Sequence, residues 1–98
     1  METKIILIDT YDKSFIENQI FQNKNVNLIL DMRNLQISEK QLEAIFKFNN
    51  KENKNGTTFV VVKEDVNFDA FSREWNIVPT IEEAKDLISL DEIMRDLE

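Results

Sequence analysis

Short apolar stretches alternate with amphipathic ones along the 98-residue chain. Strand-length apolar stretches rich in Ile, Leu and Val predict strands over residues 4–9, 26–32, 57–63 and 76–79. Apolar residues at helical spacing predict helices over residues 12–22, 38–48, 67–75, 80–88 and 90–97. Strands with continuous apolar centres, separated by helices, are typical of a parallel sheet that is buried on both faces. We therefore predict a single α/β domain over residues 1–98, with a small, mostly parallel sheet of about four strands and helices on both faces.

The C-terminal stretch "LISLDEIMRDLE" is compatible with two helical arrangements. It forms either a separate helix or the second half of one helix that bends near Ser89. Its apolar residues are Leu87, Ile88, Leu90, Ile93, Met94 and Leu97. We expect them to pack on the sheet while the acidic residues face solvent; in the alternative, a groove of a partner receives this apolar face.

Capping signals occur at four predicted helix starts. A Ser or Thr followed three residues later by Glu or Gln is found at Ser14/Glu17, Ser38/Gln41, Thr80/Glu83 and Ser89/Glu92. In such a capping box the hydroxyl accepts from the third residue's N–H, and the longer side chain accepts from the cap's own N–H. Because Ser38 is one of four similar positions, we interpret it as a helix N-cap and expect no phosphorylation there. A phosphoserine that interacts with the positive end of the helix is the alternative.

The composition removes most kinds of catalytic site. The chain has no Cys and no His, so it cannot build a thiolate nucleophile, a Ser–His triad or the commonest zinc sites. Gly56 is the only glycine, which excludes glycine-rich phosphate-binding loops. We therefore predict that the protein is not an enzyme, and we expect no cofactor and no bound metal.

The charge distribution bears on the kind of partner. The net charge is −7, and residues 64–98 hold 11 acidic and 3 basic side chains. Such a surface repels phosphate backbones, so binding to nucleic acid is not expected. No apolar run approaches the ~20 residues needed to span a bilayer, and the first residues lack the pattern of a signal peptide. These features predict a cytoplasmic protein without membrane insertion, present as a monomer or weak homodimer.

Two stretches resemble STAS domains, the fold of bacterial anti-sigma-factor antagonists and of the cytoplasmic tails of sulfate transporters. The first is "LILDMRNLQISEKQLEAIF", in which a strand ends in Leu30-Asp31 and leads through a loop to a helix. The second is "FSREWNIVPTIEEAKDLI", similar to the family's last strand, Pro-Thr turn and acidic helix. The resemblance implies a compact STAS-like domain with a regulatory role.

One motif of the family is missing. In members that are switched by phosphorylation, the helix begins with Asp-Ser-Ser-Gly, and the second Ser accepts the phosphate. Here the matching residues are "SEKQ", so Lys40 stands at the acceptor position and Gln41 at the glycine position. A shift of one residue would place Glu39 at the acceptor position. The resemblance therefore implies a degenerate member without the phospho-switch.

Three functions are compatible with these features. The first is a non-catalytic, regulatory protein–protein interaction module. Its contact residues would lie on the helix that starts at Ser38 and in the loop before it, at Arg33, Asn34, Gln36, Glu39, Lys40 and Glu43. The second is a module that senses a small anion or lipid. The third is a metal-dependent enzyme that uses the carboxylates of Asp9 and Asp31, if their strands are adjacent and parallel.

Overall fold

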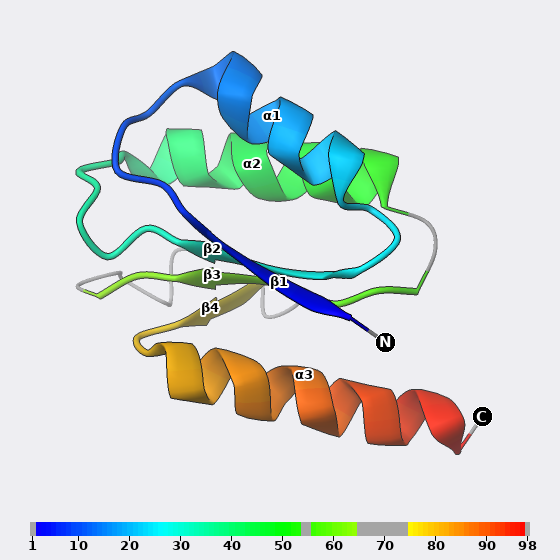
Figure 1. Ribbon diagram of the computed structural model, residues 1–98. Helices are drawn as coiled ribbons and strands as arrows, with labels where there is room; N and C mark the ends of the chain where they lie inside the picture. The colour runs from blue at the N-terminus through cyan, green and yellow to red at the C-terminus, as the bar shows by residue number, and fades with distance from the viewer. Residues whose placement is uncertain (1, 54–55, 65–74, 98) are drawn as a thin grey trace.

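The sheet has four strands, and every neighbouring pair is parallel. The computed structural model describes residues 2–53, 56–64 and 75–97, and in it the strand order is β1-β2-β3-β4 (Figure 1). The strands are β1 (Thr3–Leu7), β2 (Asn27–Asp31), β3 (Phe59–Val62) and β4 (Asn76–Val78). Leu7 lies opposite Asp31, and Asp31 lies opposite Val62. The carboxyl ends of the strands therefore meet at one edge of the sheet.

Helices cover both faces of this sheet. The helices α1 (Lys13–Gln22) and α2 (Glu39–Glu52) lie side by side on one face, and α3 (Ile81–Asp96) lies on the other (Figure 1). Crossover connections between parallel strands are right-handed. Because β2 is added beside β1 and β3 beside β2 in the same direction, the two connecting helices α1 and α2 lie on the same face of the sheet. The predicted α/β fold, with about four strands and helices on both faces, is confirmed.

Two hydrophobic clusters hold the layers together. Every residue of β2 and β3 is buried, as the continuous apolar centres of these strands require. Alternation along β2 sends Leu28 and Leu30 toward α1 and α2, while Ile29 packs in the smaller cluster under α3. Full burial of one such side chain contributes about 1.5–3 kcal/mol to folding. The two central strands therefore contribute a large part of the buried apolar surface.

Helix caps agree with the sequence at two of the four predicted positions. Ser38 and Gln41 form the complete capping box, and the Thr80 hydroxyl accepts from the N–H of Glu83 at 3.1 Å. Helix α1 instead begins after Asp12, whose carboxylate accepts from the N–H of Phe15, so the predicted cap at Ser14 is wrong. An aspartate is as good a cap as serine, and it comes first along the chain.

The C-terminal segment forms one helix, and its apolar residues do not all face the sheet. Ser89 lies inside α3, so the predicted cap there and the division into two helices are wrong. Ile88 is buried, but four apolar residues after it are 57–82% exposed: Leu90, Ile93, Met94 and Leu97. Ala84 and Ile88 pack against the sheet. The later residues on the same side of the helix, which therefore also face the sheet, are Asp91, Glu92 and Arg95.

The remaining predictions concern membrane insertion and one short helix. Each helix of the described residues is too short or too polar to cross a lipid bilayer. The helix predicted over residues 67–75 lies outside the described residues, except for Trp75. The Trp75 ring stacks on Phe46, with ring centroids 5.1 Å apart. This contact places Trp75 on the α1/α2 side of the sheet.

Candidate functional site

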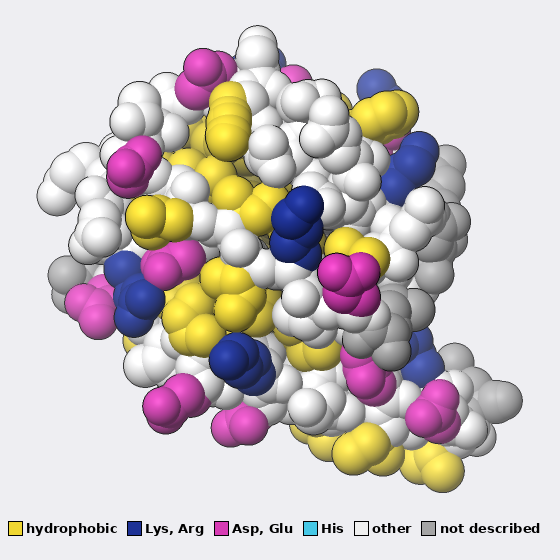
Figure 2. Space-filling view, viewed as in Figure 1, with side chains coloured by type: hydrophobic (Ala, Val, Ile, Leu, Met, Phe, Trp, Pro, Cys, Tyr) yellow, Lys and Arg dark blue, Asp and Glu magenta, His cyan; other side chains and the backbone are white. Residues whose placement is uncertain are grey.

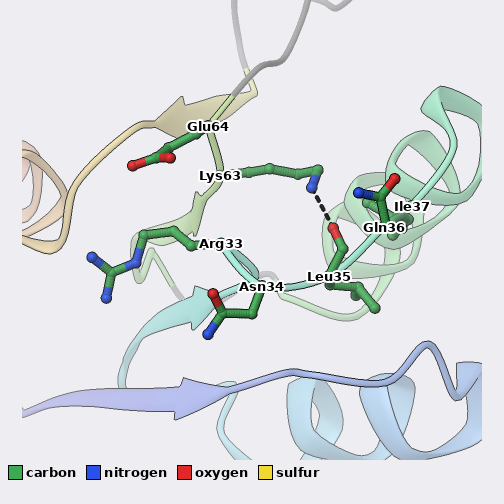
Figure 3. Close-up of a pocket in the computed structure, with 7 residues that line it drawn as sticks. All are labelled: Arg33, Asn34, Leu35, Gln36, Ile37, Lys63 and Glu64. Atoms are coloured by element: carbon green, nitrogen blue, oxygen red, sulfur yellow. Dashed lines mark hydrogen bonds between the residues drawn. The ribbon is translucent and has the colours of Figure 1, made fainter.

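The candidate site lies at the carboxyl edge of the sheet, where β2 leads into α2. We call residues 32–38 the elbow. A hollow of about 360 Å³ opens beside it (Figure 3). Five elbow residues and the two residues after β3 line this hollow: Arg33, Asn34, Leu35, Gln36, Ile37, Lys63 and Glu64. Parallel α/β sheets commonly place their binding sites at this edge, because the loops after neighbouring strands converge there.

An ion pair fixes the start of the elbow. Asp31 is the last residue of β2 and is 9% exposed. The Arg33 guanidinium donates from Nε to Oδ1 at 2.9 Å and from Nη2 to Oδ2 at 2.8 Å, and the Arg33 N–H reaches Oδ1 at 3.3 Å. This two-pronged arrangement defines the direction of the Arg33 side chain as well as its charge. Arg33 is thus held at the rim of the hollow, with 40% of its side chain exposed.

The same contacts shift both titrations. Hydrogen bonds from the Arg33 side chain lower the pKa of Asp31 below its ordinary value of 3.8, although partial burial of the carboxylate acts in the opposite direction. The hydrogen bond to Asp31 in turn raises the pKa of Arg33. Both groups are therefore charged throughout the physiological pH range.

The stability that this pair contributes is expected to disappear in acid. Because the pKa of Asp31 is lowered on folding, the contribution is present above the ordinary carboxyl pKa and is lost as the pH falls through the folded-state value, below 3.8. Urea unfolding of the protein and of Asp31→Asn should show the variant to be less stable at neutral pH. The difference should be modest, since the Arg33 side chain is exposed and the pair is therefore screened by solvent and salt.

A comparison at low pH isolates the pair from the other carboxyl groups. Below the folded-state pKa of Asp31, the protein and Asp31→Asn should unfold with the same free energy. A difference between them that stays constant from neutral to acid pH would contradict the ion pair as its cause.

Backbone and lysine contacts fix the middle of the elbow. The Met32 N–H donates to the carbonyl of Val62 at 2.8 Å, which joins the elbow to β3. Leu35 is buried at 7% exposure, and its N–H donates to the carbonyl of Met32 at 3.1 Å. The Nζ of Lys63 donates to the carbonyl of Leu35 across the hollow (Figure 3). An apolar anchor and a cationic donor thus hold the same short segment.

The capping box fixes the end of the elbow. The Gln41 side chain accepts from the N–H of Ser38 at 3.0 Å, and the Ser38 hydroxyl accepts from the N–H of Gln41 at 3.1 Å. Glu39 occupies the first turn, where a negative charge interacts favourably with the helix dipole. The sequence-based interpretation of Ser38 as an N-cap is confirmed.

The six predicted contact residues fall into two neighbouring groups. Arg33, Asn34 and Gln36 are exposed and line the hollow. Glu39 and Lys40 are exposed on the first turn of α2. The last of the six, Glu43, is half-buried one turn later and pairs with Lys47 at 2.7 Å. A shallow depression of about 290 Å³ lies on α2 beside Lys40 and Glu43. The first turn of α2 directly follows the elbow along the chain, so the two groups are neighbours.

Charges around the hollow do not converge on one point. In Figure 3 the Arg33 and Lys63 side chains extend in opposite directions, and Lys63 points toward the carbonyl of Leu35. Arg33 is neutralised by Asp31, and Lys63 is directed at a backbone carbonyl. This geometry suits recognition of a broad surface better than enclosure of one small anion, which calls for several donors that meet at a point.

The predicted carboxylate pair is only partly assembled. The strand before Asp9 is adjacent and parallel to the strand that ends at Asp31, as the metal hypothesis requires. Leu7 lies opposite Asp31 in the sheet, and Asp9 follows Leu7 by two residues. Both Asp31 oxygens, however, accept from Arg33. In the part of the chain that the structure describes, no three Asp or Glu residues come together as a metal site.

Sequence reasoning missed Lys63 and Glu64 as part of the site. Both follow β3, and β3 pairs with β2 at the strand end that leads into the elbow. The polar residue after each apolar strand is a usable signal, because the ends of parallel neighbours meet at one edge. This signal can be applied only when the order of the strands in the sheet is known, because that order decides which strand ends are neighbours.

Comparisons with known proteins identify no relative of this chain. No family model matches the chain. Comparison with curated proteins and with solved structures finds no match either. The resemblance to STAS domains therefore stays a prediction, and the assignment of function depends on the residues and geometry of the site itself.

Proposed function

We propose that this protein is a non-catalytic protein-interaction module that binds its partner through the elbow and the first turns of α2. We call the six residues of this region the elbow surface: Arg33, Asn34, Gln36, Glu39, Lys40 and Glu43. The observation that carries the proposal is that these polar side chains stand on a backbone fixed at three points. Those points are the Asp31–Arg33 ion pair, the Lys63–Leu35 hydrogen bond and the Ser38–Gln41 capping box.

A fixed backbone favours binding because less freedom is lost when the partner docks. Ordering one long side chain at an interface costs about 0.5–1.5 kcal/mol, and ordering a loop adds to this. In the elbow, the direction of Arg33 and the entry into α2 are already set before a partner arrives. The partner then meets a preformed array of donors, acceptors and both signs of charge.

The groups that carry reactivity elsewhere have structural roles at this site. The Ser38 hydroxyl accepts the capping hydrogen bond from the N–H of Gln41. The Asp31 carboxylate, which is buried, is bound by Arg33. The chain contains no His to act as a general base at neutral pH. Recognition of another protein needs none of these reactive groups.

The resemblance to STAS domains supports the same surface. In that family, regulatory partners contact the helix that follows the buried strand, and phosphorylation at the helix start controls the contact. Lys40 and Gln41 replace the acceptor serine and the glycine of that motif. We therefore expect binding to be constitutive rather than switched by phosphorylation.

Charge reversal on α2 is expected to remove the partner. In the variant Glu39→Lys/Lys40→Glu/Glu43→Lys, the shape of the helix is kept while the sign of each charge is inverted. At least one protein that the immobilised wild-type chain recovers from a lysate of the source organism should fall by at least about tenfold with this variant, as happens when like charges are placed opposite each other.

The matched control carries the same change in net charge at a residue outside the elbow surface. Glu2→Lys alters an exposed residue just before β1 and should leave the recovered partner in place. Circular dichroism should show both variants to be folded. If the α2 variant recovers its partners as well as the wild type does, the elbow surface is not the binding site.

A further inference from the structure

The outward face of α3 is acidic in its first half and apolar in its second half. Its first half carries Glu82, Glu83 and Asp86, all exposed. Its second half carries four residues that are 57%, 58%, 57% and 82% exposed, in the order Leu90, Ile93, Met94 and Leu97. Successive residues of a helix are 100° apart, so these seven side chains lie along one side of α3. We call this side the outer α3 face.

The apolar half forms a continuous ridge. Figure 2 shows hydrophobic side chains along the lower edge of the molecule, over the C-terminal half of α3. Leu90, Ile93, Met94 and Leu97 are spaced as i, i+3, i+4 and i+7, the spacing by which one helix contacts another. Contiguous apolar patches larger than a few hundred Å² are uncommon on monomeric proteins and often mark binding sites.

Polar contacts underneath hold this ridge toward solvent. Asn27 donates from Nδ2 to Glu92 Oε1 at 2.6 Å, and the Thr58 hydroxyl donates to Asp91 Oδ2 at 3.1 Å. Arg95 donates from Nη1 to the Thr58 hydroxyl at 3.1 Å and also contacts the carbonyl of Gly56. Turning α3 to bury the ridge would break these contacts and place apolar side chains on buried polar groups. The outward orientation of the ridge is therefore specified by the sequence.

Charge selects the kind of partner. Two copies of α3 in parallel would place Glu82, Glu83 and Asp86 against the same acids, which repel one another. Two antiparallel copies would place these acids against the apolar ridge of the other copy, where charges lose their water without gaining a partner. Self-association over the full length of this face is disfavoured in both directions, whereas an amphipathic partner with basic residues matches both halves along the whole length.

We propose that the outer α3 face binds an amphipathic helix of another protein. Apolar residues of that helix pack on Leu90, Ile93, Met94 and Leu97, and its Lys or Arg residues lie against Glu82, Glu83 and Asp86. At 1.5 Å per residue, the face from Glu82 to Leu97 is about 22 Å long, which matches about four turns of the partner. This surface is separate from the elbow surface, so the module binds two partners or two segments of one.

A designed peptide tests this directly. The probe is a synthetic amphipathic helix with leucines at the spacing of the ridge and lysines, further along the same side, at the spacing of the three acids. We expect the wild-type protein to bind it, with affinity that falls as salt is added. A second peptide with glutamate in place of each lysine should bind at least about tenfold more weakly. Chemical-shift changes in NMR spectra should be concentrated on α3.

Variants locate the site and separate this proposal from the proposed function. Leu90→Gln/Met94→Gln changes exposed residues and no charge, and it should weaken peptide binding by at least about tenfold; Ile93→Gln serves if that double variant does not fold. The α2 charge-reversal variant should bind the peptide normally. The proposal is overturned if the lysine peptide does not bind, if both peptides bind equally, or if sedimentation shows a dimer that Leu90→Gln/Met94→Gln abolishes.

Discussion

Replacing Leu30 with alanine is expected to lower the free energy of unfolding by about 2–5 kcal/mol. Leu30 lies in the middle of the sheet, between Ile6 of β1 and Val61 of β3, and its side chain is 0% exposed. Truncation removes buried apolar surface and leaves a cavity that strands paired on both sides cannot close. Equilibrium unfolding in urea measures the loss as a lower midpoint at an unchanged slope.

Leu90→Ala is the matched control for this prediction. The substitution is the same, but Leu90 is 57% exposed on the outer α3 face. Its effect on the free energy of unfolding should stay within about 0.5 kcal/mol, because it creates no cavity and alanine favours a helix. Equal losses for the two variants would contradict the assignment of Leu30 to the core and of Leu90 to the surface.

Asn27→Ala is expected to cost about 1–3 kcal/mol, which is large for a polar residue. Asn27 is 0% exposed at the start of β2. Its Oδ1 accepts from the N–H of Thr58 at 2.9 Å, and its Nδ2 donates to Glu92 at 2.6 Å. Alanine leaves the buried N–H of Thr58 without this acceptor and removes one of the hydrogen bonds that join the second half of α3 to the sheet. Urea unfolding measures the loss, and amide hydrogen exchange should rise in the last turns of α3.

Two further variants test whether the hydrogen bonds of Asn27 cause this loss of stability. Asn50 is exposed on α2, so Asn50→Ala should change stability by no more than about 0.5 kcal/mol. Glu92→Gln keeps an oxygen acceptor for Asn27 and should cost less than Asn27→Ala. If Asn27→Ala costs no more than Asn50→Ala, the hydrogen bonds of Asn27 do not hold α3 in place.

The fold was predictable because burial on both faces leaves a plain pattern. In β2, Leu28, Ile29 and Leu30 are consecutive and apolar, and such a run is hard to accommodate outside a covered sheet. The capped start of α2 at Ser38 followed from a local rule that acts over four residues. The cap of α1 was misplaced, because Asp12 and Ser14 both satisfy local rules and only the folded helix selects between them.

The site was predictable only in the part that is local in sequence. Arg33, Asn34 and Gln36 follow a strand and precede a helix, which makes them exposed loop residues in most α/β folds. The contribution of Lys63 depends on β3 lying next to β2, and the Asp31–Arg33 pair depends on the bend of the backbone after β2. Neither follows from the spacing of residues along the chain.

The outer α3 face could not be predicted from the number of apolar residues. The sequence-based expectation placed Leu90, Ile93, Met94 and Leu97 on the sheet because burial of apolar surface is the dominant favourable term in folding. At the amino end of the sheet, however, the helix meets Asn27 and Thr58, both buried and polar. These residues require polar partners, and their hydrogen bonds with Asp91, Glu92 and Arg95 favour the same rotation of α3 as the packing of Ala84 and Ile88.

The strand β1 has a consequence for the protein in concentrated solution. It forms one edge of the sheet, and Ile5 and Leu7 are 44% and 56% exposed along it. An open edge with apolar side chains invites pairing with the same edge of another molecule, which leads to aggregation. The exposed charge of Lys4 in a strand of only five residues opposes such pairing. Lys4 thus protects a sheet whose edge is left open.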